Sequence, residues 1–205
     1  MRLIGLTGSI GMGKSTAAAR FRHHGIAVFD ADAEVHRLYA GPLVADIEAA
    51  FPGTTTPEGV DRRKLSAALL AAPERFKDLE AIVHPRVRAE QAAFLHREFQ
   101  RGADLAVLEI PLLFEAGTNE LVDATVVVSA DAAIQRQRVL GRDDMTDEKL
   151  DTILRRQWPD AKKRACADFI VDTSGSIAHC EAQIDAIVAQ RDMLPARAYQ
   201  RHWAK

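Results

Sequence analysis

The sequence contains few of the residues that link a small protein covalently or through a metal. Only two of its 205 residues are cysteines, Cys166 and Cys180. Two cysteines support neither a disulfide framework nor a cysteine-based metal cluster. We therefore expect inert thiols in a reducing compartment and a fold that depends on its hydrophobic core.

The sequence also lacks long hydrophobic runs and an excess of charge of one sign. No apolar stretch approaches the roughly 20 residues of a membrane-spanning helix, and an apolar run at residues 3–6 leaves no room for a signal peptide. The 27 basic and 29 acidic residues give a formal charge of −2, so bulk charge does not favour nucleic acid. We expect a cytoplasmic protein with small-molecule partners and no membrane or nucleic-acid partner. A monomer is expected, with a homo-oligomer as the alternative.

A glycine-rich segment, GSIGMGKST, is the most informative feature of the chain. Gly8, Gly13, Lys14 and Ser15 match the P-loop pattern directly after the first apolar run. Glycines let the backbone N–H groups converge on an anion, and the helix that follows presents its positive dipole end. Lys14 can reach the β- and γ-phosphates of a nucleotide, and the Ser15 hydroxyl can bind Mg²⁺. The segment predicts binding of a nucleoside triphosphate.

Short apolar runs bounded by turn signals predict five strands, at residues 2–6, 26–29, 105–110, 124–128 and 169–171. These runs are apolar on both faces and are separated by helical patterns. They indicate a five-stranded parallel sheet covered by helices on both sides, which is an α/β three-layer fold of the P-loop NTPase type. The length favours one domain with insertions over two independent domains.

Two helical insertions are expected in this domain. Residues 31–102 show helix-like apolar spacing, divided by Pro42, Pro52, Pro57 and Pro73, and predict an inserted subdomain. Residues 131–167 carry six arginines with Lys162 and Lys163 and predict a lid. The alternative is a solvated amphipathic face, because acidic residues including Asp144 offset much of this charge. The remaining segments are a core at 1–30, 103–130 and 168–194, with a last helix at 177–193, and a frayed or docked tail at 195–205.

Two aspartates follow the second predicted strand. Phosphoryl transfer needs the γ-phosphoryl in line with a nucleophile, and an acceptor hydroxyl benefits from a carboxylate that takes its proton. Asp30 and Asp32 would point the same way if the backbone stayed extended, although one of them could instead cap the following helix. Spacing alone assigns neither role.

Five segments, in this order, make the chain resemble the dephospho-CoA kinase family. They are IGLTGSIGMGKST with FDADAEVHRLY, LEAIVHPRVR, VLEIPLLFEAG, RQRVLGRDDMTDEKLDTILRRQ and ADFIVDTSGS. The resemblance spans nearly the whole chain. It implies ATP-dependent phosphorylation of the ribose 3′-hydroxyl of dephospho-CoA, which yields coenzyme A and ADP in the last step of coenzyme A biosynthesis.

The resemblance also implies that residues 31–102 form the helical subdomain that binds the acceptor, and it implies roles for single residues on that side. Asp32 matches the catalytic base of the family, and Asp30 becomes its structural or water-mediated partner. His84 and Pro85 match a pair that faces dephospho-CoA, whereas His84 by itself would be interpreted as a core or helix-end histidine. Arg138 is a weaker candidate for contact with the substrate.

On the nucleotide side, the resemblance implies that Arg142 closes over ATP with the lid and takes part in catalysis together with Lys14 and Asp32. Ser15 is the expected Mg²⁺ ligand, and Glu109 is a candidate for the water shell of that ion. The implied ATP-binding residues are Gly8, Gly11, Met12, Gly13, Lys14, Ser15, Thr16 and Arg142.

One departure and two alternatives accompany this interpretation. Thr173 stands where the family usually has asparagine, which puts the adenine-side contacts of that turn in doubt. Another P-loop kinase with a different acceptor, such as a nucleoside monophosphate, is the first alternative. A GTPase-like switch is the second, but the only asparagine is Asn119, followed by Glu120, so the guanine-reading Asn-Lys-x-Asp motif does not occur.

Overall fold

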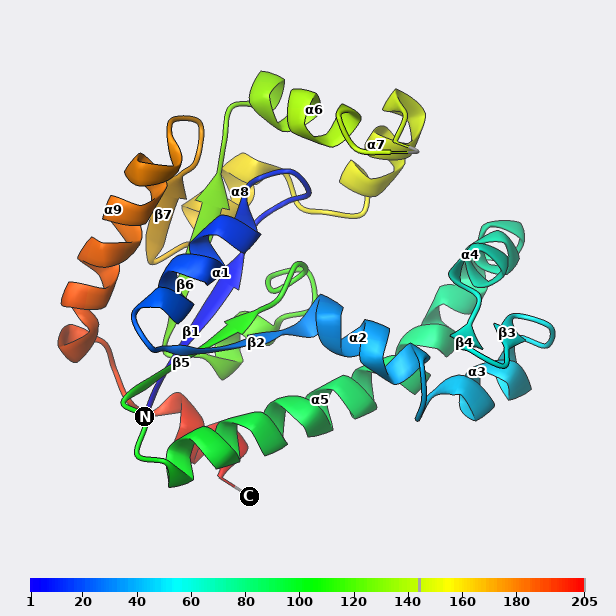
Figure 1. Cartoon of the computed structure of the whole chain (residues 1–205), viewed down its shortest axis with the longest axis horizontal. Helices are drawn as coiled ribbons and strands as arrows, with labels where there is room; N and C mark the ends of the chain where they lie inside the picture. The colour runs from blue at the N-terminus through cyan, green and yellow to red at the C-terminus, as the bar shows by residue number, and fades with distance from the viewer. Residues whose placement is uncertain (144, 205) are drawn as a thin grey trace. The chain divides into compact units, whose positions relative to one another are not determined.

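The computed structural model describes residues 1–143 and 145–204, so that Asp144 of the predicted lid and Lys205 of the tail lie outside the described residues. A five-stranded sheet has the order β2-β5-β1-β6-β7 (Figure 1). Its strands are β1 (Arg2–Thr7), β2 (Ala27–Asp30), β5 (Leu105–Glu109), β6 (Ala124–Ser129) and β7 (Phe169–Asp172). β1 pairs in parallel with β5 and β6, and β6 pairs in parallel with β7. The predicted five-stranded parallel sheet is confirmed.

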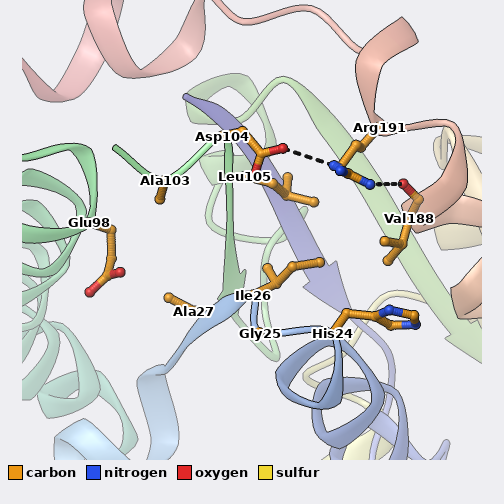
Figure 2. Close-up of a pocket in the computed structure, with 10 residues that line it drawn as sticks. All are labelled: His24, Gly25, Ile26, Ala27, Glu98, Ala103, Asp104, Leu105, Val188 and Arg191. Carbon is orange, nitrogen blue, oxygen red and sulfur yellow. Dashed lines mark hydrogen bonds and ion pairs between the residues drawn. The ribbon is translucent and has the colours of Figure 1, made fainter. Parts of the chain in front are cut away.

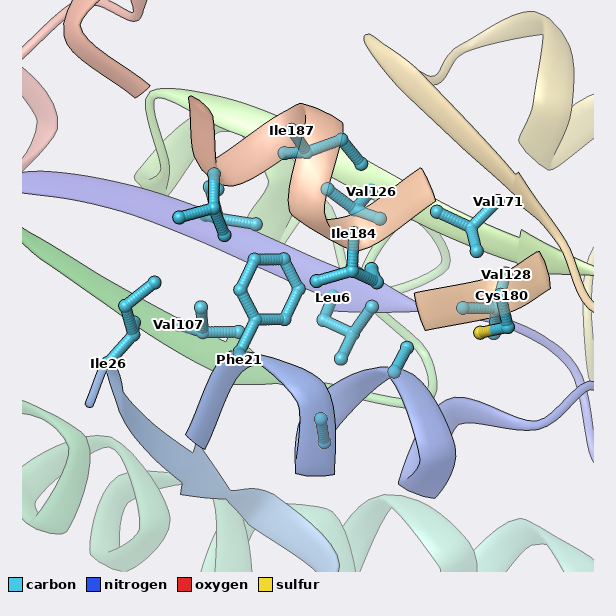
Figure 3. Packing of buried hydrophobic residues seen from close by; sticks show 14 of the residues in the cluster. Leu6, Phe21, Ile26, Val107, Val126, Val128, Val171, Cys180, Ile184 and Ile187 are labelled. Carbon is cyan, nitrogen blue, oxygen red and sulfur yellow. The ribbon is translucent and has the colours of Figure 1, made fainter. Parts of the chain in front are cut away.

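The hydrophobic core on one face of the sheet lies under two helices, α1 (Lys14–His23) and α9 (Ile177–Ala189) (Figure 3). Phe21 of α1 is fully buried between β1 and Ile184 of α9. Burial of one such aromatic side chain stabilises the fold by about 1.5–3 kcal/mol. This packing holds α1 against β1, and residues 8–13 join the carboxyl end of β1 to the start of α1.

The opposite face of β1 is covered by the chain that follows β5. Gly5 has no side chain there, and an added Cβ would lie 2.8 Å from Leu113 Cδ2 and 3.2 Å from Val122 Cγ2. The tail docks nearby, since the buried Trp203 donates from Nε1 to the Leu121 carbonyl at 2.9 Å. Of the two expectations for the tail, the docked one is correct over the described residues.

Contacts between Cα atoms divide the chain into two compact units, one of residues 1–29 and 95–204 and the other of residues 30–94. The second unit has its own core, formed by Leu38, Leu43, Ile47, Phe51, Leu65, Leu69 and Val83. Its elements are α2 (Ala31–Tyr39), α3 (Val44–Ala50), β3 (Thr55–Thr56), β4 (Gly59–Val60), α4 (Arg62–Ala71), η1 (Pro73–Arg75) and the first part of α5 (Phe76–Gln100).

The insertions agree with their expected helical character, with one addition. The β3-β4 hairpin was not predicted, because two strands of two residues leave no periodic pattern in the sequence. Residues 131–167 form α6 (Ala132–Leu140), α7 (Asp147–Leu154) and α8 (Asp160–Ala165). The short elements of the first unit are η2 (Thr118–Leu121), η3 (Arg191–Met193) and η4 (Tyr199–Trp203). The functions assigned to these segments, acceptor binding and lid closure, stay predictions.

Two expectations from the sequence concern membrane-spanning helices and the two cysteines. In residues 1–143 and 145–204, no helix combines the length and the apolar character needed to cross a bilayer. Cys166 is an exposed free thiol, and Cys180 is a buried one whose pKa is raised by burial.

Candidate active site

The P-loop joins the carboxyl end of β1 to the first turn of α1. Gly13 precedes that helix with φ of 83°, a left-handed conformation that favours glycine. Among the described residues, the N–H groups of Gly11, Gly13, Lys14 and Ser15 donate to no acceptor of the protein. Several free N–H groups at a helix start, next to the positive end of its dipole, make a site for an anion such as a phosphate.

Neighbouring segments hold the P-loop in this shape. The hydroxyl of Thr173 donates to the Met12 carbonyl at 2.8 Å and contacts the Ser129 carbonyl at 3.1 Å. The N–H of Ala130 donates to Met12 Sδ at 3.0 Å. A Cβ added to Gly13 would lie 3.3 Å from the Thr173 hydroxyl oxygen. Thr173 therefore stabilises the conformation of the P-loop, a role that the sequence did not reveal.

A buried carboxylate lies beside the P-loop lysine. Glu109 ends β5, its side chain is only 8% exposed, and Lys14 Nζ lies 3.9 Å from its Oε1. Arg22 Nη2 lies 4.0 Å from Oε2 of the same residue. Because a buried carboxylate is stable only with polar or charged partners, Glu109 holds Lys14 near the anion site.

The hydroxyl of Ser15 and the carboxylate of Glu109 are hard oxygen donors of the kind that Mg²⁺ prefers. Ser15 is exposed in the first turn of α1. In the described chain, no three histidine, cysteine, aspartate or glutamate residues are grouped to hold a metal. One or two protein oxygens, completed by water and nucleotide phosphates, are the usual Mg²⁺ site of phosphoryl-transfer enzymes. The residues present fit that ion.

The predicted lid arginines have different surroundings. Arg142 is exposed after α6, and in the described part of the chain its guanidinium forms no ion pair. Arg138 is occupied, because it donates to the Thr173 carbonyl at 2.6 Å and contacts the hydroxyl at 3.2 Å. Arg136 pairs with Asp147 of α7 at 2.5 Å. The geometry therefore leaves Arg142 the most available of these three cations, and substrate contact by Arg138 stays a prediction.

Lys163 does not belong to a cationic lid surface, and that expectation was wrong. Its side chain is fully buried, with Nζ 2.9 Å from Glu115 Oε1 and 3.4 Å from the Pro111 carbonyl. Glu115 Oε1 also accepts the N–H of Trp158 at 2.7 Å. The pair ties α8 to the segment that follows β5.

The two aspartates after β2 have separate roles in the local structure. α2 begins at Ala31, so the backbone does not stay extended and the condition for a shared direction is not met. Asp30 Oδ1 accepts the Ala33 N–H at 2.9 Å and caps the helix. Asp32 is exposed in the first turn, where the helix dipole stabilises a negative charge. Asp32 is therefore the aspartate left free for chemistry.

His84 and Pro85 lie inside α5, well away from both of its ends, and both are exposed. The interpretation of His84 as a core or helix-end residue is therefore wrong. Pro85 lacks an N–H, so the carbonyl of Ala81 has no intrahelical donor. An exposed ring and an open carbonyl on one helix suit ligand contact, although that role stays a prediction.

A pocket of about 350 Å³ opens at the amino ends of β2 and β5, the edge of the sheet opposite the P-loop (Figure 2). Asp104 and Arg191 pair across it at 2.9 Å, which lowers the pKa of Asp104. His24 pairs with Asp185, and Glu98 pairs with Arg101. Ligands of parallel sheets bind at the carboxyl edge, and these charges already satisfy one another, so the pocket is separate from the P-loop site.

Comparisons with known proteins agree with this geometry. A family model described as Dephospho-CoA kinase matches residues 2–179. The dephospho-CoA kinase of Rhizobium etli is 55% identical over 197 residues, covering 96% of this chain and 97% of that protein. The one of Brucella abortus is 52% identical over 198 residues, covering 97% and 99%.

Two solved structures have a fold similar to that of this chain. TT1252 from Thermus thermophilus has a TM-score of 0.79 at 36% identity, covering 92% of this chain and 97% of that one. Dephospho-CoA kinase from Campylobacter jejuni has a TM-score of 0.69 at 24% identity, covering 93% and 97%, and shows the shared fold.

Proposed function

Because this chain belongs to the dephospho-CoA kinase family and phosphorylates dephospho-CoA with ATP in the last step of coenzyme A synthesis, we propose roles for its individual residues. The P-loop holds the phosphates of ATP, and Asp32 activates the acceptor hydroxyl. The proposed ATP site rests on one observation, which is the group of four N–H groups at the start of α1 that donate to no acceptor among the described residues. The proposed acceptor site rests on the family resemblance of the motifs.

On the donor side, Lys14 changes partners when ATP binds. Its ammonium, 3.9 Å from Glu109, moves to the β- and γ-phosphate oxygens, where the opposing charge is greater. Arg142 adds a second cation, whose planar guanidinium can contact two phosphate oxygens at once. Met12 and Thr16 complete the loop that surrounds the phosphates. These groups neutralise charge that builds up on the transferred phosphoryl group.

On the acceptor side, Asp32 accepts the proton of the ribose 3′-hydroxyl as its oxygen attacks the γ-phosphorus. The bond from that phosphorus to the β-γ bridging oxygen breaks, and ADP leaves. Asp30 keeps the first turn of α2 in place through its cap. His84 and Pro85 contact dephospho-CoA.

Mg²⁺ fits the same site, with the Ser15 hydroxyl as its protein ligand and Glu109 in its water shell. When bound, the ion neutralises charge on the phosphate oxygens. Lys14, Arg142 and the N–H groups of the P-loop remain the protein groups that contact the phosphate oxygens directly.

An acceptor screen scored by product mass tests the reaction. Purified protein with Mg²⁺ and ATP should convert dephospho-CoA to coenzyme A and leave adenylate, shikimate and gluconate largely unchanged. Comparable turnover of any of those three would overturn the acceptor assignment in favour of another small-molecule kinase.

Replacing Asp32 tests the role of the base. Asp32→Asn should keep ATP binding but lose kcat by about 10²–10⁴-fold, the usual contribution of a general base. Asp30→Asn is the matched comparison, since asparagine caps a helix about as well as aspartate and a much smaller loss is expected. If chemistry limits turnover and Asp32→Asn keeps the wild-type kcat, Asp32 is not the base.

The cytoplasmic location and the monomeric state expected from the sequence stay predictions. Sedimentation of the purified protein tests the second of these directly.

A further inference from the structure

Ile10, in the middle of the P-loop, has both its main-chain N–H and its main-chain carbonyl held by glutamine side chains. Its N–H donates to Gln157 Oε1 at 3.1 Å. Its carbonyl accepts from Gln135 Nε2 at 2.8 Å. Each backbone group can pair with only one end of an amide, so the backbone determines which atom of each glutamine faces it.

Both glutamines belong to the segment predicted to be a lid, one on each side of α7. Gln135 lies in α6 and is 7% exposed, and Gln157 lies between α7 and α8. α6 also packs directly on the loop, since a Cβ added to Gly11 would lie 2.5 Å from Val139 Cγ2 and 3.1 Å from the Gln135 carbonyl. Two parts of residues 131–167, α6 and the segment between α7 and α8, therefore meet the P-loop at a single residue, Ile10.

This arrangement has an electrostatic consequence for the phosphates. A carbonyl that turned toward the anion site would repel the phosphate, whereas the Ile10 carbonyl is committed to the Gln135 amide. The Ile10 N–H is committed to Gln157, so the donors left for phosphate start at Gly11. The N–H and the carbonyl of Ile10 belong to two successive peptide planes. A flip of the Ile10–Gly11 plane would break the bond to Gln135, and a flip of the Ser9–Ile10 plane would break the bond to Gln157.

We propose that Gln135 and Gln157 are positioning residues for catalysis, which hold the main chain on both sides of the Ile10 Cα so that the P-loop is ready to accept ATP phosphates. They act through the loop and do not contact the nucleotide. The inference rests on the proposed nucleotide site at the P-loop. It adds that α6 and the segment between α7 and α8, both within the predicted lid, support that site.

Glutamate substitutions distinguish this role from simple packing, because glutamate has the shape of glutamine but only accepts hydrogen bonds. At position 157 an acceptor is needed, so Gln157→Glu should bind MgATP within about twofold of wild type. At position 135 a donor is needed, so Gln135→Glu and Gln135→Leu should each weaken MgATP binding about fivefold, as expected from one lost hydrogen bond. Gln157→Leu should weaken binding to a similar extent.

Gln137→Glu is the matched control for the added charge, because Gln137 lies on α6 two residues away and is exposed. Its affinity should equal that of wild type. The measurements are calorimetric titration with MgATP in the absence of dephospho-CoA and thermal unfolding of the nucleotide-free variants.

The outcomes separate the inference from the proposed function. Wild-type protein that fails to bind MgATP would refute the nucleotide site itself. Wild-type binding together with equal tolerance of glutamate at 135 and 157 would overturn the positioning role. Loss of affinity at 135 alone among the glutamate variants, with a similar loss in the uncharged Gln135→Leu, would support it. The buried carboxylate of Gln135→Glu should also lower the unfolding temperature, so the leucine variant separates lost binding from lost stability.

Discussion

Replacing Lys163 with methionine should destabilise the protein far more than replacing its neighbour Lys162. The Lys163 ammonium is fully buried 2.9 Å from Glu115 Oε1, whereas Lys162 is exposed and lies 3.3 Å from the centre of the Trp158 ring. Methionine has a similar length and fills the space of the lysine stem, so cavity formation contributes little. The change therefore isolates the buried charge.

The expected loss is about 3–5 kcal/mol, because removal of one partner leaves a buried charge without compensation. The Glu115 side chain is 12% exposed, and its Oε2 has no hydrogen-bond partner among the described residues, so water can offset little of the penalty. The exposed cation-π contact of Lys162 contributes about 0.5–1 kcal/mol. At about 2–4 °C per kcal/mol for a chain of this size, Lys163→Met should lower Tm by about 6–20 °C.

Urea unfolding and thermal unfolding of both single variants give these values. A double variant, Lys163→Met with Glu115→Gln, should recover much of the loss, because the glutamine is neutral and still accepts the Trp158 N–H. Equal losses for Lys162→Met and Lys163→Met, or no recovery in the double variant, would refute the reasoning.

Three further predictions concern the nucleotide, pH and the tail. Lys14→Ala should weaken MgATP binding, measured by calorimetry, and lower kcat, measured by a turnover assay. Wild-type values of both the affinity and kcat would contradict this. Arg20 and His24 lower the pKa of Asp185, so their pairing stabilises the fold above about pH 4 and is lost as pH falls through the lowered pKa. The Tm difference between wild type and Asp185→Asn should therefore shrink on acidification, and a constant difference would argue against it. Trp203→Ala should cost about 3–5 kcal/mol in urea unfolding, whereas a cost below about 1 kcal/mol would mean that the tail is not docked.

Features that depend on residues close in the chain were predictable. The P-loop was recognisable because glycines, a lysine and a serine must stand at fixed separations for N–H groups to converge on a phosphate. The strands were recognisable because a strand covered on both faces is apolar at every position, as in β6, where all six residues are buried.

Other features could not be settled from local signals. The sequence left open whether Asp30 and Asp32 share a direction or one of them caps the following helix, and the structure shows Asp30 as the cap with Asp32 in the first turn. Lys163 was counted with exposed cations, since a lysine next to Lys162 on a polar helix gives no sign of the buried Glu115 beneath it. The burial of a charge depends on its partner, which stands 48 positions earlier in the sequence.

By itself, then, the sequence determined the sheet, the phosphate-binding loop and the family, since each depends on a short pattern or on the order of several patterns. Only the tertiary structure decided which side chains support that loop. Gln135 and Gln157 are 125 and 147 residues from Ile10 along the chain, yet both form hydrogen bonds with its main chain. Such contacts depend on how helices pack over the sheet, and a linear pattern reports the face on which a residue lies but not the group it meets there.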